Sequence, residues 1–348
     1  MPLISKKQKT RVGLDVGSYA VKVVEMKDTP TGSEIVKVGL KKLLPGAIVD
    51  GEPMDRDAVI SAIREIYEEY DIANKETSSA ICGRSVIIKK IKMEEMDDET
   101  AREVMTLEAE QYVPFEKEEL SVDFEILRRG MAGNTMEVLL VAAKRDKVLN
   151  HISLIKDAGL VPSAIDVDTF AVQNAFELNY EYEEGRVYAL IDIGLSATNI
   201  GIVRDGIPLF NRDVPVGGET FVEGMQRKLG ITSEEARAAL EGVPGAKAEG
   251  VLGAIESVGE DLSIAIERSF SYLRSSGEAD MVDKIYLSGG GARITGLKAF
   301  LAEKLSVEVD MSNPLRNIQF DEEILGADPL TVAPSLMVAI GLASRQGS

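Results

Sequence analysis

The most constraining feature of this chain is a motif that occurs twice, near the N-terminus and again past the middle. Residues 12–24 and 190–203 each contain an apolar segment, an aspartate, an apolar residue and a glycine, followed by a segment rich in β-branched residues. Each copy predicts two antiparallel strands joined by a glycine-containing turn. A hairpin of this kind needs no aspartate to fold, yet Asp15 and Asp192 occupy the same place in the two copies.

The position of the two aspartates indicates which kind of ligand they could bind. A carboxylate that ends a strand beside the uncovered N–H groups of a glycine turn suits a metal-bound phosphate. The alternative is that Asp15 and Asp192 make turn or capping hydrogen bonds alone. Because both copies carry the aspartate at the matched position, and each copy opens one half of the chain, the sequence predicts a duplicated fold that holds one nucleotide between its halves.

Length and charge define the class of protein. The chain has 348 residues, 45% of them hydrophobic, which is enough for more than one domain core. Its formal net charge of −19 disfavours nucleic acid as a partner. No apolar run could cross a bilayer or form the core of a signal peptide, so we expect a cytoplasmic protein without direct membrane insertion. The basic residues Lys6, Lys7, Lys9 and Arg11 predict a short solvated tail.

The rare residues disfavour several chemistries. Cys82 is the one cysteine, so no disulfide within the chain and no thiolate zinc site can form, and we expect a small buried apolar side chain. His151 is the one histidine and lies on the face of a predicted helix. A Ser–His–Asp triad or a histidine-ligated metal enzyme is therefore disfavoured.

The order of predicted elements repeats after each hairpin. A third strand is expected at 34–40 and at 208–214, and a helix at 55–70 follows the first of these because its apolar residues recur at helical spacing. Strands at 86–92 and 137–143 with a helix at 98–112 predict a small α/β subdomain inside the first half. The predicted first half covers 1–185, with core segments 11–85 and 166–185 and an inserted subdomain at 86–165. The predicted second half covers 186–348, with core segments 186–216 and 285–348 and a helical insertion at 217–284.

Two further glycine motifs lie at the edges of the second insertion. Gly217 and Gly218 end a strand and begin a helix, where free N–H groups could face a phosphate or ribose. Residues 285–297 read as an apolar strand, a triple glycine and a helix, and glycines allow flat contact with a nucleoside. Either motif alone is also typical of an ordinary tight turn. Their order after two aspartate hairpins favours a nucleotide site.

In this order the motifs resemble the actin-like ATP-binding superfamily of actin, sugar kinases and heat-shock chaperones. The hairpins match its phosphate motifs, residues 288–296 its adenosine motif and residues 333–343 its second connecting helix. Segments 13–24, 110–115, 166–171 and 217–219 are similar to the PilM family of type IV pilus assembly, and 86–165 resembles the subdomain that this family shares with the division protein FtsA. The resemblance implies an α/β, actin-like (ribonuclease-H-like) duplicated fold, with two halves around a nucleotide cleft and subdomain insertions.

The resemblance also implies ATP and Mg²⁺ as ligands. Asp15 and Asp192 would hold Mg²⁺, through water because this ion gives up its hydration reluctantly. The other nucleotide-binding residues that it implies are Gly17, Ser18, Tyr19 and Lys22 in the first half and Gly194, Ser196, Thr198, Asn199, Gly217, Gly218, Glu219, Gly289, Gly290 and Arg293 in the second, with Glu223, Lys228 and Arg268 as weaker candidates. Hydrolysis needs a further group that orients water, for which Glu110, Gln111, Asp166 and Asp168 are candidates, and we expect slow turnover at most.

The partner that the resemblance implies is the N-terminal cytoplasmic tail of the membrane protein PilN. The tail would bind a groove around 86–92 and 98–112 and recruit the protein to the inner membrane, where other inner-membrane and motor components of the pilus are further implied partners. The alternatives are a small-molecule kinase of the same superfamily and a filament-forming cytoskeletal or division-type protein. Residues 342–348 do not form the terminal amphipathic helix of an FtsA-like tether, which disfavours self-anchoring.

Overall fold

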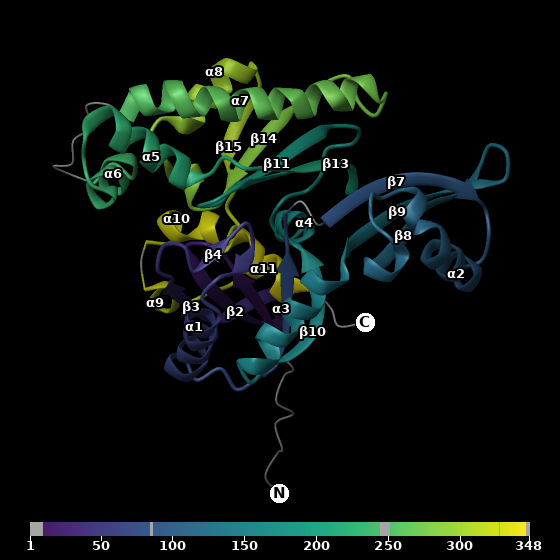
Figure 1. The fold of residues 1–348 in the computed structure, drawn as a ribbon, viewed down its shortest axis with the longest axis horizontal. Coiled ribbons are helices and arrows are strands. Elements are labelled where there is room, and N and C mark those ends of the chain that lie inside the picture. The colour runs from purple at the N-terminus through teal and green to yellow at the C-terminus, as the bar shows by residue number, and fades with distance from the viewer. Residues whose placement is uncertain (1–9, 84–85, 244–250, 327, 346–348) are drawn as a thin grey trace, which may run out of the picture.

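The computed structural model describes residues 10–83, 86–243, 251–326 and 328–345. Lys6, Lys7 and Lys9 of the predicted tail lie outside the described residues. Arg11 lies in the first strand, where its guanidinium group is 2.5 Å from the carboxylate of Asp28. Figure 1 shows two α/β halves, one above the other, with a smaller sheet extending to one side.

Two five-stranded sheets have the same strand order, which confirms the duplicated fold. The orders are β3–β2–β1–β6–β10 and β13–β12–β11–β14–β15. In each sheet the first three strands in sequence are antiparallel and the other two add in parallel. The strands are β1 (Thr10–Val16), β2 (Ala20–Thr29), β3 (Gly32–Lys42), β6 (Glu76–Ile81) and β10 (Val161–Val167), and then β11 (Val187–Ile193), β12 (Thr198–Arg204), β13 (Ile207–Val214), β14 (Lys284–Ser288) and β15 (Glu308–Met311).

Helices cover both faces of each sheet. The helix predicted at 55–70 forms as α1, capped by the Asp55 side chain, which accepts a hydrogen bond from the backbone N–H of Ala58. Figure 1 shows α1 and α3 below the first sheet, α7 and α8 above the second, and α4 and α11 between the sheets. The helices are α1 (Arg56–Glu69), α3 (Arg145–Asp157), α4 (Asp168–Asn179), α5 (Gly218–Leu229), α6 (Ser233–Leu240), α7 (Val251–Ser275), α8 (Leu297–Leu305), α9 (Glu322–Leu325), α10 (Pro329–Val332) and α11 (Met337–Ser344), with short 3₁₀ turns η3 (Gly291–Arg293) and η4 (Ala333–Leu336).

The two helices between the sheets touch through small residues. A Cβ atom on Gly341 of α11 would lie 1.7 Å from the carbonyl oxygen of Ala171 in α4, and one on Gly13 of β1 would lie 2.1 Å from that of Ala339. Only glycine permits backbones to approach so closely. Seven consecutive residues of α11 are buried, as expected for a helix enclosed on all sides. The core around α4 and α11 therefore contains residues of both halves.

The insertion in the first half has a sheet and a core of its own. Its sheet has the order β7–β9–β8, and its core includes Met105, Met136 and Leu140. The insertion ends earlier than predicted, because α3 and β10 belong to the first half: Leu154 and Ile155 of α3 are in the core beneath the first sheet. The elements of the insertion are β7 (Val86–Glu94), α2 (Asp98–Glu108), η1 (Ala109–Gln111), η2 (Lys117–Glu119), β8 (Leu120–Met131) and β9 (Thr135–Lys144).

Two remaining features complete the fold. The short hairpin of β4 (Ile48–Val49) and β5 (Glu52–Pro53) lies between β3 and α1 in sequence. The segment between β13 and β14 contains the helices α5, α6 and α7, of which α7 is the longest. Within the described ranges, no helix combines the length and the apolar composition needed to span a membrane.

Candidate functional site

A cavity of about 580 Å³ lies between the two halves, and both repeated hairpins line it. The β1–β2 turn closes when the N–H of Gly17 donates to the carbonyl of Ala20 at 3.2 Å. The β11–β12 turn closes in the same way, from Gly194 to Ala197 at 2.9 Å. The repetition in sequence is therefore also a repetition in backbone geometry.

The strand register determines which residue lies opposite each of the two aspartates. Asp15 of β1 lies opposite Lys22 of β2, and the Lys22 ammonium is 2.5 Å from the Asp15 carboxylate. Asp192 of β11 lies opposite Asn199 of β12. Asp192 also accepts a hydrogen bond of 2.7 Å from the hydroxyl of Ser288. Each aspartate is thus held by a neighbouring strand with its carboxylate at the cavity.

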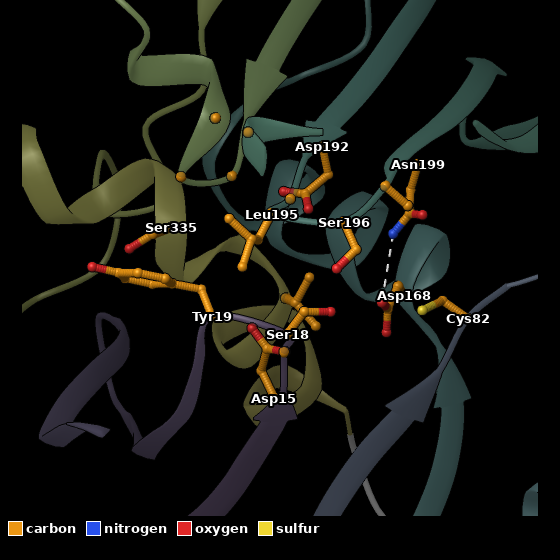
Figure 2. Close-up of a pocket in the computed structure, with 18 of the residues that line it drawn as sticks. Asp15, Ser18, Tyr19, Cys82, Asp168, Asp192, Leu195, Ser196, Asn199 and Ser335 are labelled. Carbon is orange, nitrogen blue, oxygen red and sulfur yellow. Dashed lines mark hydrogen bonds between the residues drawn. The ribbon is translucent and has the colours of Figure 1, made fainter. Parts of the chain in front are cut away.

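The two aspartates face each other across the cavity. Figure 2 shows Asp15 and Asp192 reaching in from opposite halves, with Ser18 and Ser196 between them. Burial, and then repulsion from Asp15, raises the pKa of Asp192 to about 6, although bonds to Ser288 and attraction to Lys22 oppose this. Burial disfavours the charged form of Lys22, but attraction to Asp15 outweighs it and raises the lysine pKa. Two facing carboxylates in a low-dielectric cavity favour a bound cation.

The donor set fits Mg²⁺ better than a metal bound by protein ligands alone. Carboxylate oxygens suit this hard ion, which keeps several waters and takes phosphate ligands. In the part of the chain that the structure describes, no cluster of three or more His, Cys, Asp or Glu residues could hold a metal. A cation at Asp15 and Asp192 would therefore complete its coordination with water and phosphate oxygens.

One end of the cavity has a flat, side-chain-free wall. Gly289 has φ +83°, and a Cβ there would lie 2.3 Å from the carbonyl oxygen of Ile193, so this position requires glycine. At Gly290 an added Cβ would meet no heavy atom of the described residues within 4 Å. The N–H of Gly289 donates to the carbonyl of Pro334 at 2.8 Å, and Figure 2 shows the next residue, Ser335, beside Tyr19 and away from Asp168. A planar ring fits such a wall.

The opposite end of the cavity is polar and contains a third carboxylate. Burial, followed by repulsion from Asp15, raises the pKa of Asp168 to about 7. Asn199 lies at the limit of hydrogen-bond distance from it, with 3.5 Å between the amide nitrogen and a carboxylate oxygen. Cys82 was expected to be a buried core side chain but lines this end of the cavity, and burial raises the pKa of its thiol.

Most of the predicted nucleotide-binding residues meet in this cavity. Those that line it are Asp15, Gly17, Ser18, Tyr19, Lys22, Asp192, Gly194, Ser196, Asn199, Gly218, Gly289, Gly290 and Arg293. The motifs also missed some lining residues, among them Lys147, Asp213 and Arg237. These three lie on separate elements and carry no sequence motif, although an isolated charge at the end of a predicted strand, as at Asp213, is a weak signal.

The family model described as type IV pilus assembly protein PilM matches residues 13–347. The chain belongs to the PilM family. A chain of the solved PilM–PilN type IV pilus biogenesis complex has a TM-score of 0.84 and 26% identity, covering 96% of this chain and 97% of that one. MreB5 of Spiroplasma citri bound to ADP has a TM-score of 0.50 and 12% identity, covering 96% and 94%. These similarities confirm the predicted actin-like fold.

A curated relative outside the PilM family comes from cell division. FtsA of Bacillus subtilis is 23% identical over 350 residues, covering 87% of this chain and 78% of FtsA. This similarity agrees with the FtsA-like branch of the superfamily that the sequence motifs indicate.

Three of the main predicted residues of this PilM family member do not line the cavity, and neither do the weaker candidates Glu223, Lys228 and Arg268. Thr198 is fully buried, and its hydroxyl donates to the carbonyl of Val216 at 2.6 Å. A Cβ on Gly217 would lie 2.4 Å from the carbonyl oxygen of Leu195, so this glycine permits close packing of two loops. Glu219 forms an ion pair with Arg237. Among the candidate water-orienting groups, Asp168 lines the cavity, whereas Asp166 pairs with Arg345.

His151 supports the first hairpin from α3. The hydroxyl of Ser79 donates to the carbonyl of Leu14 at 2.7 Å, so its single proton is used and it accepts from Nε2–H of His151 at 2.8 Å. Leu14 directly precedes Asp15. Burial, and then the charge of Lys147, lowers the pKa of His151 to about 4, so the ring is neutral at pH 7.

Proposed function

We propose that this PilM family member is an ATP-binding scaffold of type IV pilus assembly, with Mg-ATP in the cleft between its halves. The observation that carries the proposal is the facing pair Asp15 and Asp192, each at the same position of a repeated hairpin, in one cavity. The ADP bound to MreB5 supports a nucleotide in a cleft of this fold. Family membership supports the role in pilus assembly.

Each part of the cavity has a role in this proposal. Asp15 and Asp192 would hold Mg²⁺ through water, and the ion would neutralise the phosphate charge. The backbone N–H groups of the two hairpin turns, with Ser18 and Ser196, would donate to phosphate oxygens. The glycine wall at Gly289 would take the adenine ring, with Tyr19 at the same end.

ATP turnover is expected to be slow at most. Asp168 is the carboxylate at the polar end, and its raised pKa of about 7 leaves part of the population protonated at neutral pH. The other three groups that could orient an attacking water, Glu110, Gln111 and Asp166, do not line the cavity. The proposal is therefore a nucleotide-dependent scaffold rather than a fast ATPase.

Calorimetric titration of Mg-ATP tests the cleft. Asp15→Asn and Asp192→Asn keep the shape of each side chain but remove its charge, so each should weaken Mg-ATP binding about tenfold or more. Asp261→Asn, on the exposed side of α7, is the matched control and should bind like the parent protein. Unchanged affinity in both cleft variants, with circular dichroism that shows an intact fold, would contradict the nucleotide site.

The proposed partner is the N-terminal tail of PilN, on the insertion around β7 and α2. The solved PilM–PilN complex supports this partner. In the cell, the protein would be cytoplasmic and would reach the inner membrane through PilN. Leu107 of α2 is 59% exposed and lies on the helix that borders the proposed groove.

A fluorescent peptide with the sequence of the PilN tail tests this assignment. Leu107→Ser should weaken binding at least fivefold, because it removes apolar contact area without opening a cavity. Leu252→Ser, at a 72% exposed leucine of α7, is the matched control. Equal affinity of both variants and the parent protein would place the tail elsewhere.

A further inference from the structure

We propose that Tyr19 and Arg237 form a contact that closes one entrance of the cleft, and that this contact sets how fast nucleotide enters and leaves. The inference rests on the proposed function and adds a kinetic control to it. Arg237 carries no sequence motif, and the binding roles proposed above do not include it. Its basis is a set of contacts at the nucleoside end of the cavity.

This end of the cavity has partly exposed residues on both sides. Tyr19, in the β1–β2 turn of the first half, is 37% exposed, and the side chain of Arg237, in α6 of the second half, is 27% exposed. Both residues line the cavity. The N–H of Thr295 donates to the carbonyl of Leu240 at 2.9 Å, which attaches the end of α6 to the segment that follows the glycine wall. Residues that border a cavity and also reach solvent lie at an entrance, here the one beside the proposed adenine wall.

Two cations lie against the ring of Tyr19. The guanidinium group of Arg237 is 5.9 Å from the ring centroid, and the ammonium group of Lys42 is 5.4 Å from it. The negative face of an aromatic ring attracts cations at such distances. Lys42 ends β3 and belongs to the same half as Tyr19, whereas Arg237 belongs to the other half. Of these two contacts, the arginine contact is therefore the one that spans the cleft.

Each partner in this contact is held by its own half. The carbonyl of Tyr19 accepts a hydrogen bond of 2.9 Å from the N–H of Leu43. A hydrogen bond between the side chains of Tyr19 and Lys42 raises the pKa of that lysine. Arg237 forms an ion pair with Glu219 of α5. Because these bonds tie each side chain to its own half, separation of the halves at this entrance must break the contact between Tyr19 and Arg237.

The contact joins two protein groups, and the nucleotide is not part of it. Passage through this entrance in either direction requires the contact to break, so its loss should speed entry and release by a similar factor. The dissociation constant, which is the ratio of the two rate constants, should then stay nearly unchanged. Loss of a group that binds the nucleotide directly would instead speed release and weaken affinity. A cation over an aromatic ring at a partly exposed site corresponds to about a fivefold change in each rate.

Stopped-flow fluorescence of the full chain with the magnesium complex of N-methylanthraniloyl-ATP measures both rates. Entry comes from the dependence on concentration, and release comes from displacement by excess Mg-ATP. Arg237→Gln should raise each rate about fivefold, and Arg237→Lys, which keeps a cation, should lie between this variant and the parent protein. Calorimetry with unmodified Mg-ATP should give Arg237→Gln a dissociation constant within about twofold of the parent value.

Two further measurements assign the effect to the contact. Arg227→Gln is the matched control and should keep the parent rates, because Arg227 is exposed on the neighbouring helix α5 and does not line the cavity. In a Tyr19→Ala background, Arg237→Gln should change neither rate, because the ring that it contacts is gone. In a Tyr19→Phe background the ring remains, and Arg237→Gln should again speed both rates.

Each outcome distinguishes the inference from the proposed function. Parent-like rates in Arg237→Gln, faster release with unchanged entry, or an effect that persists in the Tyr19→Ala background would each overturn the inference and leave the nucleotide site intact. Absence of Mg-ATP binding by the parent protein would overturn the proposed function and the inference with it.

Discussion

Alternation along a strand decides which residue of each hairpin reaches the cavity. Thr198 and Asn199 are neighbours on β12, and adjacent side chains of a strand point to opposite faces. Asn199 therefore lines the cavity, whereas Thr198 is buried against Val216. The sequence motif includes both polar residues and does not show which face is the inner one.

At this scale the repeated aspartates were predictable and several of their neighbours were not. Asp15 and Asp192 belong to a local pattern of strand, carboxylate and glycine, and the fold brings such patterns to equivalent places. Lys147 and Asp213 meet near the cavity because separate elements pack together, and no local pattern records that packing.

The histidine gives a pH-dependent prediction at the same scale. His151 has a folded-state pKa of about 4, below the ordinary value of 6.5. As the pH falls from 6.5 to about 4, the unfolded chain binds a proton at this histidine that the folded protein does not bind. The free energy of unfolding that the neutral ring contributes above pH 6.5 is therefore lost over this range. With allowance for partial exposure, the loss is about 2 kcal/mol of unfolding free energy.

Urea denaturation at pH 7.5 and at pH 4.5 measures this effect. His151→Gln has no titrating ring, so its disadvantage relative to the parent protein should shrink by about 2 kcal/mol at the lower pH. Carboxylates titrate in both proteins and cancel in the comparison. A constant difference between the two proteins across this range would show that His151 is not held in its neutral form.

Among the elements, α11 explains the most about how the halves join. The sequence predicted a helix near 333–343 and the structure has η4 followed by α11, with the helix buried on all sides. The end of the first insertion was less predictable. Residues 145–165 are helical and then extended, a pattern that suits the insertion and the sheet equally well, and packing against α1 assigns them to the first half.

Glycine substitutions test the helix crossing. Gly341→Ala brings a Cβ within 1.7 Å of a backbone oxygen that cannot move independently, so it should destabilise the protein by about 3 kcal/mol. Gly253→Ala in α7 is the control, because its Cβ would meet the flexible end of the Lys228 side chain. That variant should be neutral or up to about 1 kcal/mol more stable. Thermal unfolding that ranks the two variants equally would contradict the crossing.

In the whole molecule, the hydrophobic cores differ in whether they include residues of both halves or of one part alone. The core around α4 and α11 contains residues from both halves, whereas the core of the insertion contains residues 87–142 alone. The two halves should therefore unfold together, and the insertion should be able to unfold while the halves stay folded.

Two core truncations test this division by hydrogen exchange. Met136→Ala should cost about 2–5 kcal/mol and speed exchange within 86–143 while the two large sheets stay protected. Phe176→Ala, at the centre of an aromatic cluster in the shared core, should speed exchange in both sheets. Exchange that rises throughout the molecule in Met136→Ala would show that the insertion unfolds together with the halves.

The contact of Gly341 with Ala171 also restricts how the halves can turn relative to each other. A rotation that keeps these two backbones in contact must have its axis close to the crossing of α4 and α11. Atoms beside an axis move little, and distant atoms move in proportion to their distance from it. Because the insertion extends away from this crossing (Figure 1), a small turn of the halves becomes a wide displacement at the far end of β7, β8 and β9.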